Sequence, residues 1–160
     1  LHFRLASRVL QALARALDGR GCEVGGSDLK VKNAAVNSYV YPDVVVICGE
    51  PRFDDEQLDV LLNPTAVVEV LSPSTEAHDR GKKSQVYRAI PSLQTYVLVA
   101  QDEPRIEWFE RAGEFWVLHE ALGLDAVAAL ESLAVTLPLA EVYAGVSFAA
   151  EPGEGSVEPG

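Results

Sequence analysis

Glu69 is a carboxylate in the middle of an apolar run, residues 66–71 (AVVEVL), which Ser-Pro-Ser-Thr ends. A short apolar run closed by turn residues predicts a buried strand. An ionised carboxylate inside such a strand costs on the order of several kcal/mol unless a cation neutralises it. Asp43 precedes another apolar run, residues 44–48 (VVVIC). If these two strands are neighbours in a sheet, their carboxylates lie close together.

Three more polar side chains follow on a helix predicted over residues 76–89. Asp79, Lys83 and Tyr87 are spaced i, i+4 and i+8, so they share one face of that helix. The connection between strand and helix is short and contains Ser72, and it returns this face over the sheet. We therefore expect two acids, an amine and a phenol to converge on one place.

This set of side chains favours a divalent cation. Hard cations prefer oxygen ligands, and Mg²⁺ commonly takes one or two protein carboxylates while it keeps several waters. We predict that Asp43 and Glu69 hold Mg²⁺ or Mn²⁺, with the main-chain carbonyl of Val70 as a third protein oxygen. Lys83 would polarise a metal-bound water or stabilise negative charge on a phosphate in the transition state. The supporting residues in this prediction are Ser72, Asp79 and Tyr87.

Basic residues of the same helix are candidates for contacts with nucleic-acid phosphates. They are Arg80, Lys82 and Arg88. The whole chain carries 24 acidic and 13 basic residues, with a net charge of −11, which argues against tight non-specific binding to nucleic acid. The basic group could equally offset the negative charge of the chain, and the sequence leaves both interpretations open.

The motifs YPDV at 41–44, VEVLSPST at 68–75 and DRGKK at 79–83, followed by Tyr87, resemble the Uma-type family of endonucleases. This family is a bacterial branch of the PD-(D/E)XK restriction-endonuclease-like superfamily. The similarity covers roughly residues 1–145. It implies a restriction-endonuclease-like α/β core with the order α-β-β-β-α-β, in which Asp43 and Glu69 are metal ligands and Lys83 is the catalytic lysine.

The sequence departs from the superfamily pattern at one position of the motif. The pattern places a lysine two residues after the glutamate, where this chain has Leu71, and the Uma-type branch places its lysine on the following helix, as Lys83 does. The chain contains no methionine, so we expect further sequence before Leu1, where family members usually carry a segment. His2 opens the first predicted helix and could face the site in the complete protein, but we prefer its interpretation as an ordinary terminal histidine.

The resemblance implies a metal-dependent endonuclease that hydrolyses DNA phosphodiester bonds, and a homodimer, since cleavage of a duplex needs two sites. Two other functions remain open. The chain could be a catalytically silent nuclease-fold module that binds without turnover, or a structural subunit of a homo-oligomer. In either of these cases Glu69 and Lys83 would form a buried ion pair without chemistry.

The positions of these residues depend on a mixed α/β fold predicted for one domain over residues 1–149. Apolar side chains at a helical period predict the helices, and short apolar or alternating runs predict the strands. The predicted elements are a helix at 3–17, strands at 22–26, 28–35, 44–48 and 66–71, a helix at 76–89, a strand at 94–100, a hairpin at 104–112 and 114–121, and a short helix at 137–146. This order predicts a central mixed sheet flanked by the first and second helices.

The remaining features concern the tail, the cysteines and location. Residues 150–160 have the composition of a disordered tail. Cys22 and Cys48 lie far apart without metal-binding spacing, so we expect two reduced, buried thiols. No apolar run approaches the roughly 18 residues that span a bilayer. Arginines interrupt the first apolar residues, which argues against a signal peptide, and we therefore expect a cytoplasmic protein without membrane contact.

Overall fold

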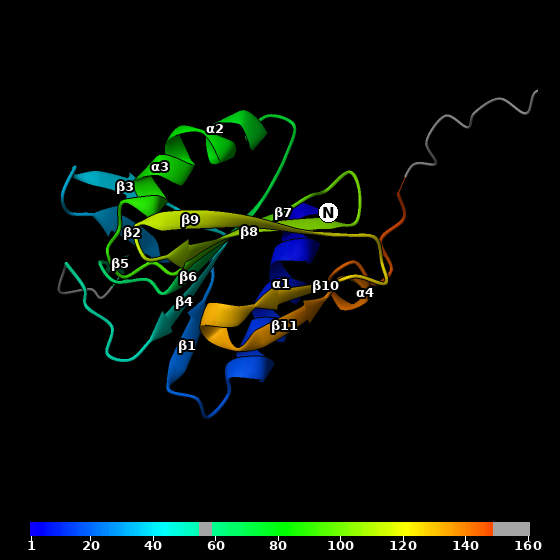
Figure 1. Ribbon diagram of the computed structural model, residues 1–160, viewed down its shortest axis with the longest axis horizontal. Coiled ribbons are helices and arrows are strands. Elements are labelled where there is room, and N and C mark those ends of the chain that lie inside the picture. Colours follow the sequence, from blue (N-terminus) through cyan, green and yellow to red (C-terminus); the bar gives the residue numbers. More distant parts are fainter. Residues whose placement is uncertain (55–58, 149–160) are drawn as a thin grey trace, which may run out of the picture.

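The computed structural model describes residues 1–54 and 59–148, so the tail predicted at 150–160 lies outside the described residues. Its centre is a six-stranded sheet with the order β1-β4-β6-β7-β8-β9 (Figure 1). The strands are β1 (Cys22–Gly25), β4 (Val44–Cys48), β6 (Ala66–Val70), β7 (Thr95–Val99), β8 (Arg105–Ala112) and β9 (Phe115–Leu122). β6 and β7 run parallel, and the other neighbours run antiparallel. The predicted mixed α/β arrangement around a central mixed sheet is confirmed.

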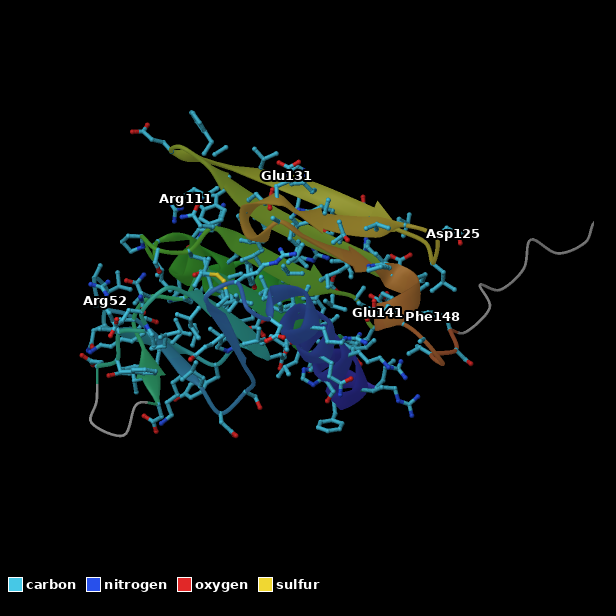
Figure 2. All side chains as sticks on the ribbon, turned by 90° about the horizontal axis from the view of Figure 1, so that it is seen from below. Arg52, Arg111, Asp125, Glu131, Glu141 and Phe148 are labelled. Atoms are coloured by element: carbon cyan, nitrogen blue, oxygen red, sulfur yellow. A yellow bond between two sulfur atoms is a disulfide. The ribbon has the colours of Figure 1, made fainter. Side chains whose placement is uncertain are left out.

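One face of the sheet packs against α1 (His2–Leu17). The helix buries the side chains that its 3.6-residue period aligns, among them Leu5, Val9 and Leu13. The same layer contains β10 (Val127–Leu130), η1 (Glu131–Leu133), β11 (Val135–Pro138) and α4 (Leu139–Val142). Arg15 of α1 pairs with Glu141 of α4, which Figure 2 labels. No helix within the described ranges is long and apolar enough to cross a membrane.

The opposite face is covered by α2 (Glu76–Arg80), α3 (Lys82–Arg88) and a small sheet. This small sheet has the order β3-β2-β5, formed by β2 (Lys30–Asn33), β3 (Ser38–Val40) and β5 (Val60–Leu61). Neighbouring side chains of β6 alternate between the two layers: Val68 packs with α1, whereas Val67 packs beneath α3. Glu69 is therefore on the side of α2 and α3.

The strands predicted at 22–26 and 28–35 do not belong to the same sheet. β1 pairs with β4, whereas β2 pairs with β3 and β5. The chain leaves the large sheet at Gly25-Gly26, and the strand predicted at 28–35 is shortened to Lys30–Asn33. The hairpin around Gly113 is confirmed, with φ of 62° at that glycine. The β10–β11 hairpin was not predicted, because its alternation is short and weak.

The prediction of a single helix over 76–89 is wrong in one respect. Gly81 separates α2 from α3, with φ of −97° and ψ of −105°, which is not a helical conformation. A Cβ at this position would lie 3.1 Å from the carbonyl oxygen of Ala77. Glycine is unfavourable inside a helix and adopts other conformations readily, so the break occurs there.

The prediction of two reduced thiols is also wrong, because Cys22 and Cys48 form a disulfide (yellow in Figure 2). The two residues are opposite each other in the antiparallel pair of β1 and β4, with Cα atoms 4.0 Å apart. A separation of 26 residues carries no sign of this pairing, which depends on the register of two strands. Structural disulfides persist mainly in oxidising compartments, so the cysteines do not support the expected cytoplasmic location.

Reduction of this disulfide should lower the free energy of unfolding by about 2–4 kcal/mol, because the crosslink restricts the unfolded chain. Urea denaturation with and without a thiol reductant measures this change. The double variant Cys22→Ser/Cys48→Ser is the control and should unfold identically with and without reductant. Equal stability of oxidised and reduced wild type would contradict the prediction.

Candidate active site

A cavity of about 430 Å³ opens where β6 ends, β4 begins and α1 begins. The connection from β6 to α2 and the start of α1 lie at this same end of the large sheet (Figure 1). The residues that line the cavity come from five separate segments of the chain: His2, Tyr41, Asp43, Glu69, Val70, Ser72, Thr75, Asp79, Lys83 and Gln101. The structure therefore brings together the residues that the sequence analysis expected to converge.

Glu69 is the most constrained of these side chains. It lies within β6 and is 3% exposed. The Lys83 ammonium is 2.6 Å from Glu69 Oε1, and the Tyr87 hydroxyl donates a hydrogen bond of 2.7 Å to the same oxygen. Lys83 also lies 3.4 Å from Asp79 Oδ1, one helical turn before it. The predicted shared face of Asp79, Lys83 and Tyr87 thus meets Glu69, despite the break at Gly81.

Asp43 lies beside Glu69 because of the strand register. Val44 is opposite Val68 in the antiparallel pair of β4 and β6. Asp43 precedes Val44 and Glu69 follows Val68, so this register brings the two acids to the same end of the pair. Asp43 Oδ2 accepts a hydrogen bond of 2.7 Å from the main-chain N–H of Val70. This bond fixes the Asp43 carboxylate at the end of β6.

His2 also reaches this place, with its Nε2 3.2 Å from the Asp43 carboxylate. This contact agrees with the alternative that His2 faces the site, and not with the preferred interpretation as an ordinary terminal histidine. The contact follows from the packing of α1, whose first turn ends over the start of β4, and the sequence of α1 alone carries no sign of it. The side chain of His2 remains about half exposed (48%).

The electrostatics of the site are dominated by the burial of Glu69. The pKa of Glu69 is raised to about 7, chiefly because burial penalises the charged carboxylate and to a lesser extent because of the negative charge of Asp43. The Lys83 ammonium and the Tyr87 hydroxyl act in the opposite direction on this pKa, because both stabilise the carboxylate. Among the described residues, no group of three or more His, Cys, Asp or Glu side chains is arranged to hold a metal ion.

The family described as "Uma2: Putative restriction endonuclease" matches residues 1–140. The chain belongs to the Uma2 family. This finding confirms the resemblance on which the sequence analysis relied.

Relatives and a solved structure agree with this membership. The uncharacterized proteins slr1290 and sll1609 of Synechocystis sp. (strain ATCC 27184 / PCC 6803 / Kazusa) are 35% and 37% identical to this Uma2 protein. The matches cover 92% and 78% of this chain, and 76% and 71% of the relatives. The crystal structure of "a putative nuclease belonging to DUF820" from Anabaena variabilis ATCC 29413 has the same fold, with a TM-score of 0.69 at 15% identity. That match covers 89% of this chain and 79% of the other.

The three basic residues predicted to contact nucleic acid do not line the cavity. The Arg80 guanidinium donates to both carboxylate oxygens of Glu107, at 2.9 and 2.7 Å, and this pairing lowers the pKa of Glu107. Lys82 is exposed on the far side of α3, beside the small sheet. The Arg88 guanidinium lies 5.5 Å from the centre of the Phe109 ring. Arg80 and Arg88 thus lie against side chains of β8, and Lys82 lies beside the small sheet.

Besides His2, three lining residues were not among the predicted site residues: Tyr41, Thr75 and Gln101. Gln101 follows β7, and Thr75 precedes α2. The Thr75 hydroxyl is 2.8 Å from the hydroxyl of Ser72, which is itself one of the predicted supporting residues. Parallel strands end at the same edge of a sheet, so the residue after β7 was a candidate once β6 and β7 were both known to be strands.

The raised pKa of Glu69 predicts a dependence of stability on pH. An acid whose pKa is raised by folding contributes stability below its ordinary pKa, near 4.5, and loses that contribution as the pH rises through about 7. The Glu69→Gln variant has no titrating carboxyl group at this position, so it does not lose this stability as the pH rises. The free energy of unfolding of the variant, relative to wild type, should therefore rise by about 2–3 kcal/mol between pH 4.5 and pH 8.

Urea denaturation in a chelating buffer, repeated across this pH range, measures the difference. Glu120→Gln changes an exposed glutamate of β9 in the same chemical way and serves as the matched control. Parallel stability profiles for wild type and Glu69→Gln would contradict the prediction.

Proposed function

We propose that this Uma2-family protein is a metal-dependent endonuclease that hydrolyses DNA phosphodiester bonds on a restriction-endonuclease-like core. The observation that carries the proposal is the arrangement of Lys83 between Glu69 and Asp79 in an open cavity that Asp43 also lines. The family description supports it. Among the large sheet and its helices, the order α1, β1, β4, β6, α2–α3, β7 agrees with the expected core, into which the small-sheet strands β2, β3 and β5 are inserted.

The donor atoms of the site fit Mg²⁺ or Mn²⁺. Asp43 and Glu69 would supply carboxylate oxygens, and the main-chain carbonyl of Val70, another lining residue, would be the third protein oxygen. Three acids, Asp43, Glu69 and Asp79, face one lysine, so the site has an excess of negative charge. Two carboxylates suit a hard cation that keeps its waters, better than a metal that needs a complete cage of protein ligands. When bound, the cation would polarise the phosphate and acidify a water molecule.

The roles that we propose for the other residues follow from their contacts. Lys83 would stabilise the negative charge that gathers on the phosphate in the transition state, since it lines the cavity and its side chain is 15% exposed. Asp79 orients Lys83 across one turn of the helix. Tyr87 holds the Glu69 carboxylate by its hydrogen bond, and Ser72 offers a hydroxyl at the cavity wall.

Lys82 and Arg88 are proposed to contact the DNA backbone away from the cavity: Lys82 is exposed on α3, and the Arg88 guanidinium lies over the ring of Phe109. Arg80, which we also assigned to this group, is held by Glu107 and Glu76 and would contribute chiefly to the local potential. We further propose a homodimer, since two sites of opposite orientation are needed to cut both strands of a duplex.

Lys83→Ala should reduce kcat for Mg²⁺-dependent cleavage of plasmid or oligonucleotide DNA by roughly 10²–10³-fold, because a preorganised cation is lost from the transition state. Glu69→Gln should reduce cleavage to the background rate, because a ligand is lost. Lys30→Ala, a lysine of β2 that does not line the cavity, is the charge-matched control and should cleave at the wild-type rate. Unchanged cleavage by both site variants would remove this assignment.

A second candidate function is the catalytically silent nuclease-fold binding module. The direct contact of Lys83 with Glu69 favours it, because an ion pair at 2.6 Å already neutralises the buried carboxylate. The purely structural subunit makes a related prediction, in which Glu69→Gln changes stability and nothing else. A measurement of metal binding distinguishes both of these functions from the endonuclease, because only the endonuclease needs a bound cation.

Titration calorimetry with Mn²⁺ should show binding to the wild type that Asp43→Asn and Glu69→Gln both lose, because each variant removes a charged ligand. Glu120→Gln should bind Mn²⁺ as the wild type does. Absence of Mn²⁺ binding by the wild type at millimolar concentration would instead favour the silent module.

A further inference from the structure

A second cavity, of about 420 Å³, adjoins the candidate active site. The two cavities share Ser72 and Gln101 as lining residues, so they are compartments of one groove. The second compartment lies where the parallel strands β6 and β7 end, which is the edge at which sheets of this kind usually bind ligands. The candidate active site does not use it.

The walls of this compartment are mainly apolar. Leu71, Pro73 and Ala100 form them, and Leu71 and Ala100 are almost completely buried. Its volume lies within the range of small-molecule sites, roughly 300–1,000 Å³. Apolar walls suit a planar ring, because enzymes that hold an unpaired base enclose it between apolar or aromatic side chains.

The charges at the rim exclude a second phosphate from this compartment. No lysine or arginine is among its lining residues, whereas Glu76 and Asp102 both are. Glu76 is bound to Arg80 at 2.9 Å, but Asp102 has no ion pair among the described residues. A carboxylate accepts hydrogen bonds from amino groups and repels phosphate, so the compartment favours a neutral ligand that carries an amine.

Gln101 lies at the junction of the two cavities and is free to contact a ligand. Within residues 1–54 and 59–148, its side-chain amide makes no hydrogen bond to the protein. An amide presents a donor and an acceptor together, which is the combination that pairs with the edge of adenine. Its position lets it contact a group in either compartment.

We propose that the compartment lined by Leu71, Ser72, Pro73, Ala100, Gln101 and Asp102 binds one unpaired base of a DNA strand whose phosphate lies beside Lys83. We name it the base subsite. It prefers bases with an exocyclic amine, adenine or cytosine, over thymine, because Gln101 and Asp102 present acceptors to that amine. The placement of the phosphate rests on the proposed function, whereas the choice of a base rests on the walls and charges of the subsite itself.

The first experiment measures binding without cleavage. Fluorescence anisotropy with Ca²⁺ in place of Mg²⁺, which keeps a hard cation among the acids of the site, compares short oligothymidine strands in which one position is replaced by adenine, cytosine or an abasic residue. At one position, adenine or cytosine should bind about tenfold more tightly than thymine, and the abasic residue should bind most weakly. Tenfold corresponds to about 1.4 kcal/mol, within the range of a good base contact.

Two variants test the residues named. Gln101→Leu keeps the approximate size of the side chain and removes its hydrogen-bonding groups. The ratio of the affinities for the adenine and thymine strands should therefore fall close to one. Asp102→Asn should weaken the preference for cytosine. Gln11→Leu, the same change at an exposed residue of α1, is the matched control and should keep the wild-type preference.

The outcomes separate the base subsite from the proposed nuclease. If DNA is cleaved but the abasic strand binds as well as the others at every position, the subsite proposal is overturned and the nuclease stands. If no strand is bound or cleaved, saturation-transfer NMR with deoxyadenosine, thymidine and deoxyribose decides. Binding of deoxyadenosine that Gln101→Leu weakens supports the subsite without the nuclease, and no nucleoside binding overturns it.

Discussion

The buried carboxylate of Glu69 and the ammonium of Lys83 form the contact on which the site depends. β6 lies in the interior of the sheet between β4 and β7, and the Glu69 side chain is only 3% exposed although it lines the cavity. The cost of that burial must be offset by groups from another layer. α3 supplies two of them, Lys83 and Tyr87, on consecutive turns of one face. The site is therefore also the polar connection between the sheet and the helix above it.

The two short helices are fixed to the sheet at separate points. Arg80, at the end of α2, is paired with Glu107 on β8, whereas Lys83, in the first turn of α3, is paired with Glu69 on β6. Gly81 lies between these two anchors and absorbs the change of direction. A continuous helix would impose one rigid relation on the two side chains, so the break lets each pair adopt its own geometry.

The sequence predicted the layers of the fold better than its connections. Local patterns suffice for α1, for the apolar strands β4, β6 and β7, and for the hairpin around Gly113, because each pattern lies within one element. The Cys22–Cys48 disulfide and the contact between His2 and Asp43 depend on residues far apart in the chain. The spacing of Asp79, Lys83 and Tyr87 predicted their common face because helical periodicity is local. The partner of Arg80 could not be predicted from local patterns, because Glu107 lies on β8, two strands away from β6 in the sheet.

Leu71 connects the unusual position of the lysine with the cavity beside the site. In the PD-(D/E)XK pattern that the sequence resembles, this position holds the lysine, on the same face of the strand as Glu69. Here it holds an aliphatic side chain that is 4% exposed and forms a wall of the second cavity. A lysine at position 71 would place its charge against that apolar wall. Supplying the ammonium from α3 instead keeps the cation within 2.6 Å of Glu69 and leaves the end of β6 apolar. Because α3 carries the lysine and β6 does not, the candidate active site is charged whereas the second cavity keeps its apolar wall.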